Sequence, residues 1–223
     1  MRINFKKTKV IPFNFSKTKD FIPEVSFPSS EPLDVVYQTK LVGLVISSNL
    51  SWGPHIDYTV ANASKKLWLL VRFKNRGAKQ EQLLTLYQLK LRSIAEFAAP
   101  AFHGALTAQQ SNKLEMVQKK AFAIILGATY KNYSNALALL GQETLSSHRL
   151  KLCENFSQKC MKSDKHADLF PLNEGPKTRH IKTFIEPKCK TSRYYNSAKS
   201  IFVTVIKQRT ERNILGRALT DKP

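Results

Sequence analysis

Apolar residues recur at spacings of three and four over the middle of this chain, and no other feature limits its possible folds as strongly. The pattern starts after Pro54 and continues to Cys160, and its first members are Ile56, Val60, Ala63, Leu67 and Leu70. This spacing places apolar side chains on one face of an α-helix. Because the connections between the periodic stretches are short, residues 53–165 are predicted to form a bundle of about five helices.

Local signals set the expected limits of these helices. Pro54 suits the first turn of a helix, and Thr107 followed by Gln110 is a capping-box pattern. Glycine, as at position 127, is typical of a helix C-terminal end. The predicted helices extend from Pro54 to about Leu70, from Lys79 to before Pro100, from Thr107 to Gly127, from Ser134 to Leu140 and from Thr144 to Cys160.

The segments on either side of the predicted bundle have a different character. Within residues 1–52, the β-branched and aromatic runs 9–15 and 40–46 are typical of strands, and the almost continuously apolar stretch Leu41 to Ile46 predicts a buried strand. Residues 166–223 are interrupted by proline and glycine and are basic, with one helix expected from about Tyr195 to Gln208. The predicted fold class is therefore mainly α, with a few N-terminal strands and a basic C-terminal tail.

The charge of the chain indicates its class of partner. It carries 36 Lys and Arg against 16 Asp and Glu, a formal net charge of +20. Such self-repulsion is relieved by polyanions, and nucleic acid is the first candidate. The cations concentrate in two stretches without acids, residues 58–80 and 116–142. Their candidate phosphate contacts are Lys65, Lys66, Arg72, Lys74, Arg76, Lys119 and Lys120. The alternative for each single residue is a solvated charge on a helix face.

Several other classes of protein are not expected. No apolar run approaches the length of about 18 residues that a membrane span needs, and the N-terminal residues lack the apolar core of a signal peptide. Three cysteines favour reduced thiols. We therefore expect a nuclear or cytoplasmic protein without a membrane partner, and the charge favours the nucleus.

Cysteine and histidine residues near the C-terminus raise the question of a zinc site. Cys153, Cys160, His166, His180 and Cys189 lack the tight loop that a zinc knuckle requires, and no orienting group indicates a Cys–His nucleophile. Cys153 and Cys160 lie seven residues apart, on one helix face, where cysteine acts as a small hydrophobe. We predict no metal site and no cofactor.

Trp52 has two possible roles. It could stack on a nucleic-acid base. The prediction that we prefer is an anchor in the core at the corner between a strand and a helix.

A series of matches in order resembles the part of non-LTR retrotransposon reverse transcriptases, of the jockey-like LINE lineages, that follows the palm. The matching stretches are 41–56, 63–67, 96–103, 114–127, 139–141 and 193–198, which includes Arg193. The resemblance implies palm and primer-grip strands in residues 1–52, a helical thumb in 53–165 and a basic segment in 166–223. A thumb holds the template and primer through their backbone.

The same resemblance implies that catalytic aspartates are missing. Residues 4–9 are similar to the last palm motif, so Lys7 and Lys9 are further candidate phosphate contacts; the alternative for both is a solvated charge on an edge strand. In the family, the magnesium ligands precede this motif. The six aspartates here include no adjacent pair, and nucleotidyl transfer needs two Mg²⁺ ions on carboxylates. The resemblance therefore implies a chain that is not an enzyme by itself.

The expected function is sequence-tolerant binding of RNA, DNA or their hybrid. If four to six phosphates are engaged, the log-log slope of affinity for B-DNA against salt should be roughly −3.6 to −5.4. Two alternatives remain open. The chain could be a scaffold that docks on a polymerase palm supplied in trans, with Leu41 to Ile46 as an apolar patch, or a relic reading frame without function.

Overall fold

The computed structural model describes residues 8–13, 33–163, 165, 188–204 and 206, and the structural statements below concern these residues. It is mainly helical with a few short strands, which confirms the predicted fold class at that level. The longer helices are α1 (Gly53–Ser64), α2 (Leu67–Asn75), α3 (Gln80–Tyr87), α6 (Ala108–Leu126), α7 (Tyr133–Leu140) and α8 (Leu145–Met161). The shorter ones are a π-helical turn (Gln88–Arg92), α4 (Ser93–Ala95), α5 (Ala99–Phe102), two 3₁₀ turns (His103–Ala105 and Gly127–Thr129) and α9 (Ser192–Tyr195).

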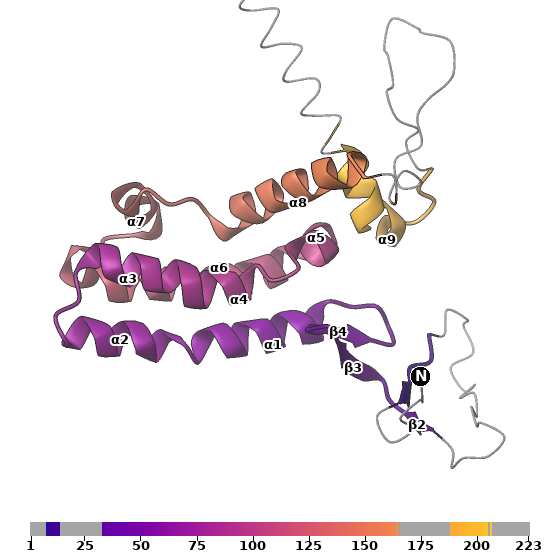
Figure 1. Cartoon of the computed structure of the whole chain (residues 1–223), viewed down its shortest axis with the longest axis horizontal. Coiled ribbons are helices and arrows are strands. Elements are labelled where there is room, and N and C mark those ends of the chain that lie inside the picture. The colour runs from indigo at the N-terminus through magenta and orange to yellow at the C-terminus, as the bar shows by residue number, and fades with distance from the viewer. Residues whose placement is uncertain (1–7, 14–32, 164, 166–187, 205, 207–223) are drawn as a thin grey trace, which may run out of the picture.

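The long helix α6 lies at the centre of the helical part. It packs against α1 and α2 along one side, and against α3, α7 and α8 elsewhere. Figure 1 shows α1 and α2 following each other nearly in line, with α3 and α4 running back beside them. In the same view α8 forms the far side of the assembly, and α9 lies at its C-terminal end.

Three predicted helix starts and stops are confirmed because local capping sets them. Thr107 and Gln110 form the expected capping box of α6, with the Thr107 hydroxyl accepting from the Gln110 amide at 3.2 Å. Thr144 caps α8 by accepting from the Ser147 amide at 3.1 Å. Gly141 ends α7 in the left-handed conformation, with φ of 58°.

The predicted single helix from Pro54 to Leu70 is wrong, because a turn at Lys65 and Lys66 divides it into α1 and α2. The Lys66 amide donates to the Ala63 carbonyl at 3.0 Å, a bond across three residues that tightens the last turn. Ala63 and Leu70 are fully buried on either side of this turn. Since apolar residues at the helical spacing are buried both before and after the turn, that spacing alone does not reveal the break.

The predicted buried strand from Leu41 to Ile46 is also wrong. The segment is an antiparallel hairpin of β3 (Gln38–Leu41) and β4 (Leu44–Ser47), with Leu41 opposite Leu44. Val42 and Gly43 form its two-residue turn at φ of 48° and 88°, and glycine adopts this conformation at little cost. Because the turn reverses the chain at its apolar centre, Leu41 is 57% exposed and Val42 85% exposed.

The remaining strands are very short. β1 (Lys9–Val10) pairs in parallel with β2 (Asp34–Val35), so only the start of the predicted strand 9–15 forms a strand. Residues 14 and 15 lie outside the described part.

Three clusters of buried side chains hold the helices together. One joins α2, α3, α6 and α7 around Leu70 and Phe122, and a second joins α1, α5, α6 and α8 around Ile56 and Leu114. Trp52 packs against the second cluster, with its ring centroid 5.9 Å from that of Phe102. This contact confirms Trp52 as an anchor at the corner between the hairpin and α1.

The third cluster joins α8 to the C-terminal residues. Cys153 and Cys160 are buried there against Phe202, Val203 and Ile206, which confirms both cysteines as small hydrophobes. Burial raises the pKa of the Cys153 thiol to about 11. The expected helix from Tyr195 to Gln208 is present only in part: residues 198–204 are helical after a turn at 196–197, and residues 207–208 lie outside the described part.

A buried polar network, which sequence patterns did not predict, connects α3, α6 and α7. The Tyr87 hydroxyl donates to Gln118 Oε1 at 2.5 Å, and Gln118 Nε2 donates to the Tyr133 hydroxyl and to the Glu143 carbonyl, both at 2.8 Å. The Tyr133 hydroxyl in turn donates to Glu115. Buried polar groups are satisfied only in one arrangement, so this network specifies how the helices pack.

Candidate nucleic-acid interface

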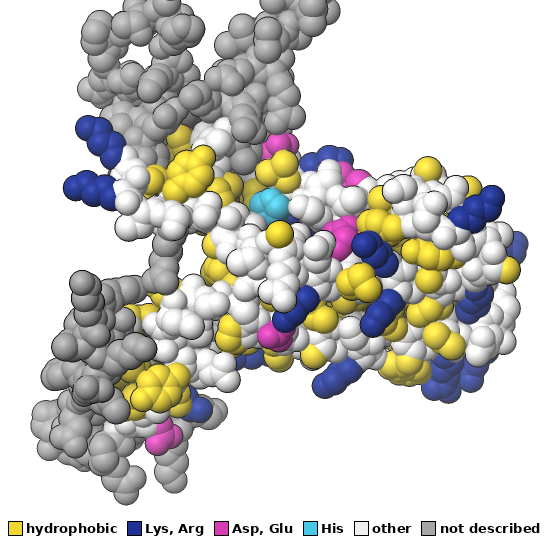
Figure 2. All heavy atoms as spheres, turned by 180° about the vertical axis from the view of Figure 1, so that it is seen from behind, with side chains coloured by type: hydrophobic (Ala, Val, Ile, Leu, Met, Phe, Trp, Pro, Cys, Tyr) yellow, Lys and Arg dark blue, Asp and Glu magenta, His cyan; other side chains and the backbone are white. Residues whose placement is uncertain are grey.

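Four cations lie in the turn between the first two helices and on α2, and we call Lys65, Lys66, Arg72 and Arg76 the α1–α2 cationic face. All four side chains are exposed. Lys65 and Lys66 occupy the turn between the helices, Arg72 lies within α2, and Arg76 is at its C-terminal end. Figure 2 shows Lys and Arg side chains gathered at the end of the molecule that contains α2, with no acidic side chain among them in that view.

The net positive charge of this face is retained because nearby acids form ion pairs with other residues. Asp57 pairs with Lys113 at 2.6 Å, Glu96 with Arg92 and His148, and Glu143 with Lys151. Within the described residues, no ion pair joins the α1–α2 cationic face to an acid. The face therefore retains its positive charge and can attract an external anion.

Trp68 adds an aromatic ring to this face, and the sequence interpretation did not single it out. Its side chain is 52% exposed, and the Arg72 guanidinium carbon lies 5.7 Å from its ring centroid. Residues 68, 72 and 76 are spaced by four, so they share one side of α2. This spacing of one aromatic residue and two arginines is the sequence pattern that could have identified Trp68 as part of the face. Exposed aromatic rings beside cations are suited to base stacking.

Lys74, another predicted phosphate contact, differs from the exposed cations because its side chain is hydrogen-bonded to α6. Its ammonium donates to the carbonyls of Ile124 at 2.5 Å and Ile125 at 3.3 Å, at the C-terminal end of α6. These carbonyls lack partners within their own helix and carry its negative dipole end. Gly127 leaves the space for this contact, since a Cβ atom there would lie 2.5 Å from the ammonium. Lys74 therefore joins α2 to α6.

Replacing Lys74 by methionine should destabilise the fold without weakening nucleic-acid binding. The substitution keeps an unbranched side chain but removes the charged hydrogen bonds to α6, and we expect a loss of about 1–2 kcal/mol in the free energy of unfolding. Urea unfolding measures this loss, with Lys120→Met as the control because Lys120 is exposed on α6. A loss no larger than that of the control would contradict this role.

The second predicted cationic stretch is only partly available. Lys119 is half-buried, with its ammonium 5.1 Å from the Tyr133 ring centroid. Lys120 is exposed and lies seven residues after Lys113, on the same side of α6. Lys113 on α6 contacts α1, and Ile124, further along α6, contacts α2. Lys120 lies between these two residues on α6, so it lies near the turn that joins α1 to α2. Its charge adds to the positive charge of the α1–α2 cationic face.

The remaining predicted contacts are not brought to this face. Lys9 is exposed on β1, which pairs with β2 at the opposite end of the molecule from α2 (Figure 1). Lys7 and the side chain of Arg193 lie outside the described part of the structure. The site that the structure assembles is therefore smaller than the predicted set.

The described part contains no group of three or more His, Cys, Asp or Glu side chains placed to hold a metal ion. None of its helices combines the length and the hydropathy that crossing a bilayer requires. No protein-family model, curated protein or solved structure matches the chain.

Proposed function

We propose that this chain binds RNA, DNA or their hybrid through the phosphate backbone, with the α1–α2 cationic face as the principal contact. The observation that carries the proposal is that Lys65, Lys66, Arg72 and Arg76 are exposed and have no acid paired with them in the described residues. Uncompensated cations bind phosphate by releasing condensed counterions, which supplies most of the affinity of sequence-independent binding.

The chemistry of the side chains favours tolerance of sequence. Lysine ammonium groups contact phosphate as point charges, and arginine adds a planar fork that matches phosphate oxygens. Trp68 can stack on any exposed base. Phosphate and stacking contacts position a strand without identifying its bases. The complex should therefore discriminate weakly between sequences.

The proposal extends to the resemblance. We infer that the helical part is a thumb-like segment of a non-LTR reverse transcriptase that clamps a template and primer. The order of the sequence matches and the mainly helical fold support this inference. Nucleotidyl transfer is not part of the proposed function, because this sequence offers no pair of aspartates that matches a two-metal site.

A salt titration tests the proposal. The full chain and a labelled 20-nucleotide RNA–DNA hybrid are mixed at increasing NaCl concentration, and the dissociation constant is measured by fluorescence anisotropy. Four phosphate contacts should give a log-log slope of about −3 to −4. Affinities for two hybrids of unrelated sequence should agree within about threefold. An affinity indifferent to salt would contradict the proposal.

The docking scaffold is a second candidate function, and the exposed hairpin turn favours it. Leu41 and Val42 present apolar side chains at its tip, although not as the continuous buried strand that was expected. A partner such as a polymerase palm would cover this tip. Failure to bind the hybrid at any salt concentration in the titration above would favour this candidate.

A further inference from the structure

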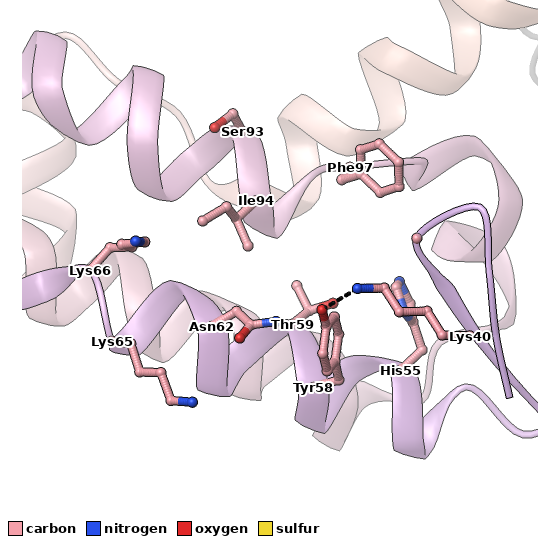
Figure 3. Close-up of a pocket in the computed structure, with 11 residues that line it drawn as sticks. Lys40, His55, Tyr58, Thr59, Asn62, Lys65, Lys66, Ser93, Ile94 and Phe97 are labelled. Carbon is pink, nitrogen blue, oxygen red and sulfur yellow. Dashed lines mark hydrogen bonds between the residues drawn. The ribbon is translucent and has the colours of Figure 1, made fainter. Parts of the chain in front are cut away.

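A pocket of about 620 Å³ lies between α1, α4 and the β3–β4 hairpin. Figure 3 shows Tyr58 and Asn62 on its α1 side, Ile94 and Phe97 on the opposite side, and Lys40 at the hairpin end. The turn that carries Lys65 and Lys66 closes the other end. Its size falls within the range of small-molecule sites, roughly 300–1,000 Å³.

The charge of this pocket favours an anionic ligand. Three lysines line it, and no aspartate or glutamate does. Lys40 donates to the Tyr58 hydroxyl at 2.5 Å, which holds the pKa of Tyr58 below its ordinary value. An ammonium has three N–H donors, so Lys40 keeps others for a ligand. Lys65 and Lys66 are exposed and have no ion pair in the described residues.

Phe97 supplies an aromatic surface. Its side chain is 52% exposed, although the two residues before it, Ala95 and Glu96, are buried. The backbone of Gly43 packs so close to the ring that a Cβ atom at that position would lie 2.7 Å from it. The hairpin turn therefore holds one edge of the Phe97 ring and leaves the rest accessible. A flat apolar ring in such a position can stack on a nucleobase.

His55 adds a donor without a partner. Its side chain is 2% exposed and belongs to the lining of the pocket. His55 Nδ1 accepts from the Val45 amide at 3.3 Å, and burial lowers the pKa of the imidazole, so in the neutral ring Nε2 carries the proton. Nε2 has no hydrogen-bond partner among the described residues. Because Nε2 is itself buried, the proposed ligand contacts do not include it.

We propose that the pocket binds a nucleoside 5′-monophosphate, either free or as the 5′-phosphorylated end of a strand. The base stacks on Phe97, and the phosphate contacts Lys65 and Lys66. A phosphate monoester carries a charge of about −1.5 to −2 at pH 7, which matches two ammonium groups better than the single charge of an internal phosphodiester. The inference deepens the proposed function, because Lys65 and Lys66 also belong to the α1–α2 cationic face.

Isothermal titration calorimetry of the full chain with AMP tests this site. Adenosine lacks the phosphate and inorganic phosphate lacks the base, so both should bind at least tenfold more weakly than AMP. Equal affinity for AMP and inorganic phosphate would overturn the proposal, since it would show that surface lysines alone account for binding. Absence of AMP binding would overturn it as well.

Variants locate the site. Lys66→Gln and Phe97→Leu should each weaken AMP binding at least fivefold, whereas Lys159→Gln, an equal loss of charge on exposed α8 surface, should leave it unchanged. Urea unfolding of each variant shows whether the fold is intact. If Phe97→Leu proves unstable, Lys66→Gln carries the test alone. Equal effects of Lys66→Gln and Lys159→Gln would overturn the assignment.

One more comparison distinguishes a free nucleotide from a strand end as the ligand. It also distinguishes failure of the pocket proposal from failure of the proposed backbone binding. A strand-end site predicts that a 5′-phosphorylated 10-mer binds more tightly than the same 10-mer with a 5′-hydroxyl, and that Lys66→Gln removes the difference. A free-nucleotide site predicts AMP binding without that difference. A chain that binds the 20-nucleotide hybrid but not AMP overturns only the pocket, and one that binds AMP but not the hybrid overturns only backbone binding.

Discussion

Replacing Lys65, Arg72 and Arg76 together by glutamine should lower the affinity for a nucleic-acid hybrid by roughly 100- to 500-fold at 0.1 M salt. Each of these exposed side chains has no acid paired with it in the described part of the chain, so each can release about one counterion on binding. The log-log slope against salt should become shallower by about 2–3. Anisotropy titrations of the variant and the parent chain measure both quantities.

A matched control separates local contacts from net charge. Lys90, Lys159 and Lys162 are also exposed, but Lys90 lies on the π-helical turn, Lys159 on α8 and Lys162 directly after α8. Their replacement by glutamine lowers the net charge by the same amount, and we expect the slope to change by less than one. If both triple variants lose the same affinity, diffuse charge accounts for binding and the α1–α2 cationic face does not.

Replacing Arg149 by alanine should destabilise the fold by about 3–5 kcal/mol, the largest effect we expect from a single substitution. Its side chain is fully buried on α8, and NH2 donates to the Ser111 hydroxyl at 2.9 Å. Burial lowers the pKa of the guanidinium, and the carboxylates of Glu115 and Glu96 act in the opposite direction. The substitution removes the positive charge near Glu115, whereas Glu96 keeps Arg92 and His148 as partners, and it also leaves a cavity. Urea unfolding measures the change.

Two comparisons give this prediction its specificity. Lys159→Ala, on the exposed surface of the same helix, should change the free energy of unfolding by less than about 0.5 kcal/mol. Arg149→Met and Glu115→Gln should be non-additive by at least about 1 kcal/mol, because neutralising Glu115 removes part of the penalty of losing Arg149. Additive effects would show that Arg149 contributes packing volume and not charge.

Helices whose ends depend on local chemistry could be predicted from the sequence. The hydroxyls of Thr107 and Thr144 satisfy amide groups three residues later in the chain, and Gly141 needs only its own conformational freedom to end α7. None of these devices requires a distant residue. The mainly helical class followed from them together with the apolar period.

Features that depend on distant packing could not be predicted in this way. The break at Lys65 and Lys66 leaves the apolar spacing intact, and the β3–β4 hairpin replaces one apolar strand by two short strands around Gly43. In each case several local conformations satisfy the same pattern. Contacts of the hairpin with α1 and of α2 with α6 select among them.

The candidate site shows the same division at the level of single residues. A stretch without acids correctly indicated exposed cations in residues 58–80. Arg72 and Lys74 stand two positions apart in it, yet Arg72 is exposed beside Trp68 and Lys74 donates to the end of α6. Charge in the sequence does not distinguish a free cation from a helix cap. The difference arises from which side of α2 faces α6.

By itself, the sequence determined the helical class, the main helix ends and the excess of cations, since these depend on spacing, caps and composition within short stretches. The tertiary structure decided which cations remain free, that Lys40, Lys65 and Lys66 meet at one pocket with Phe97, and that Arg149 is buried. These properties depend on contacts between segments far apart in the chain. Only packing brings such segments together, and a charge acquires its role from the groups that packing places around it.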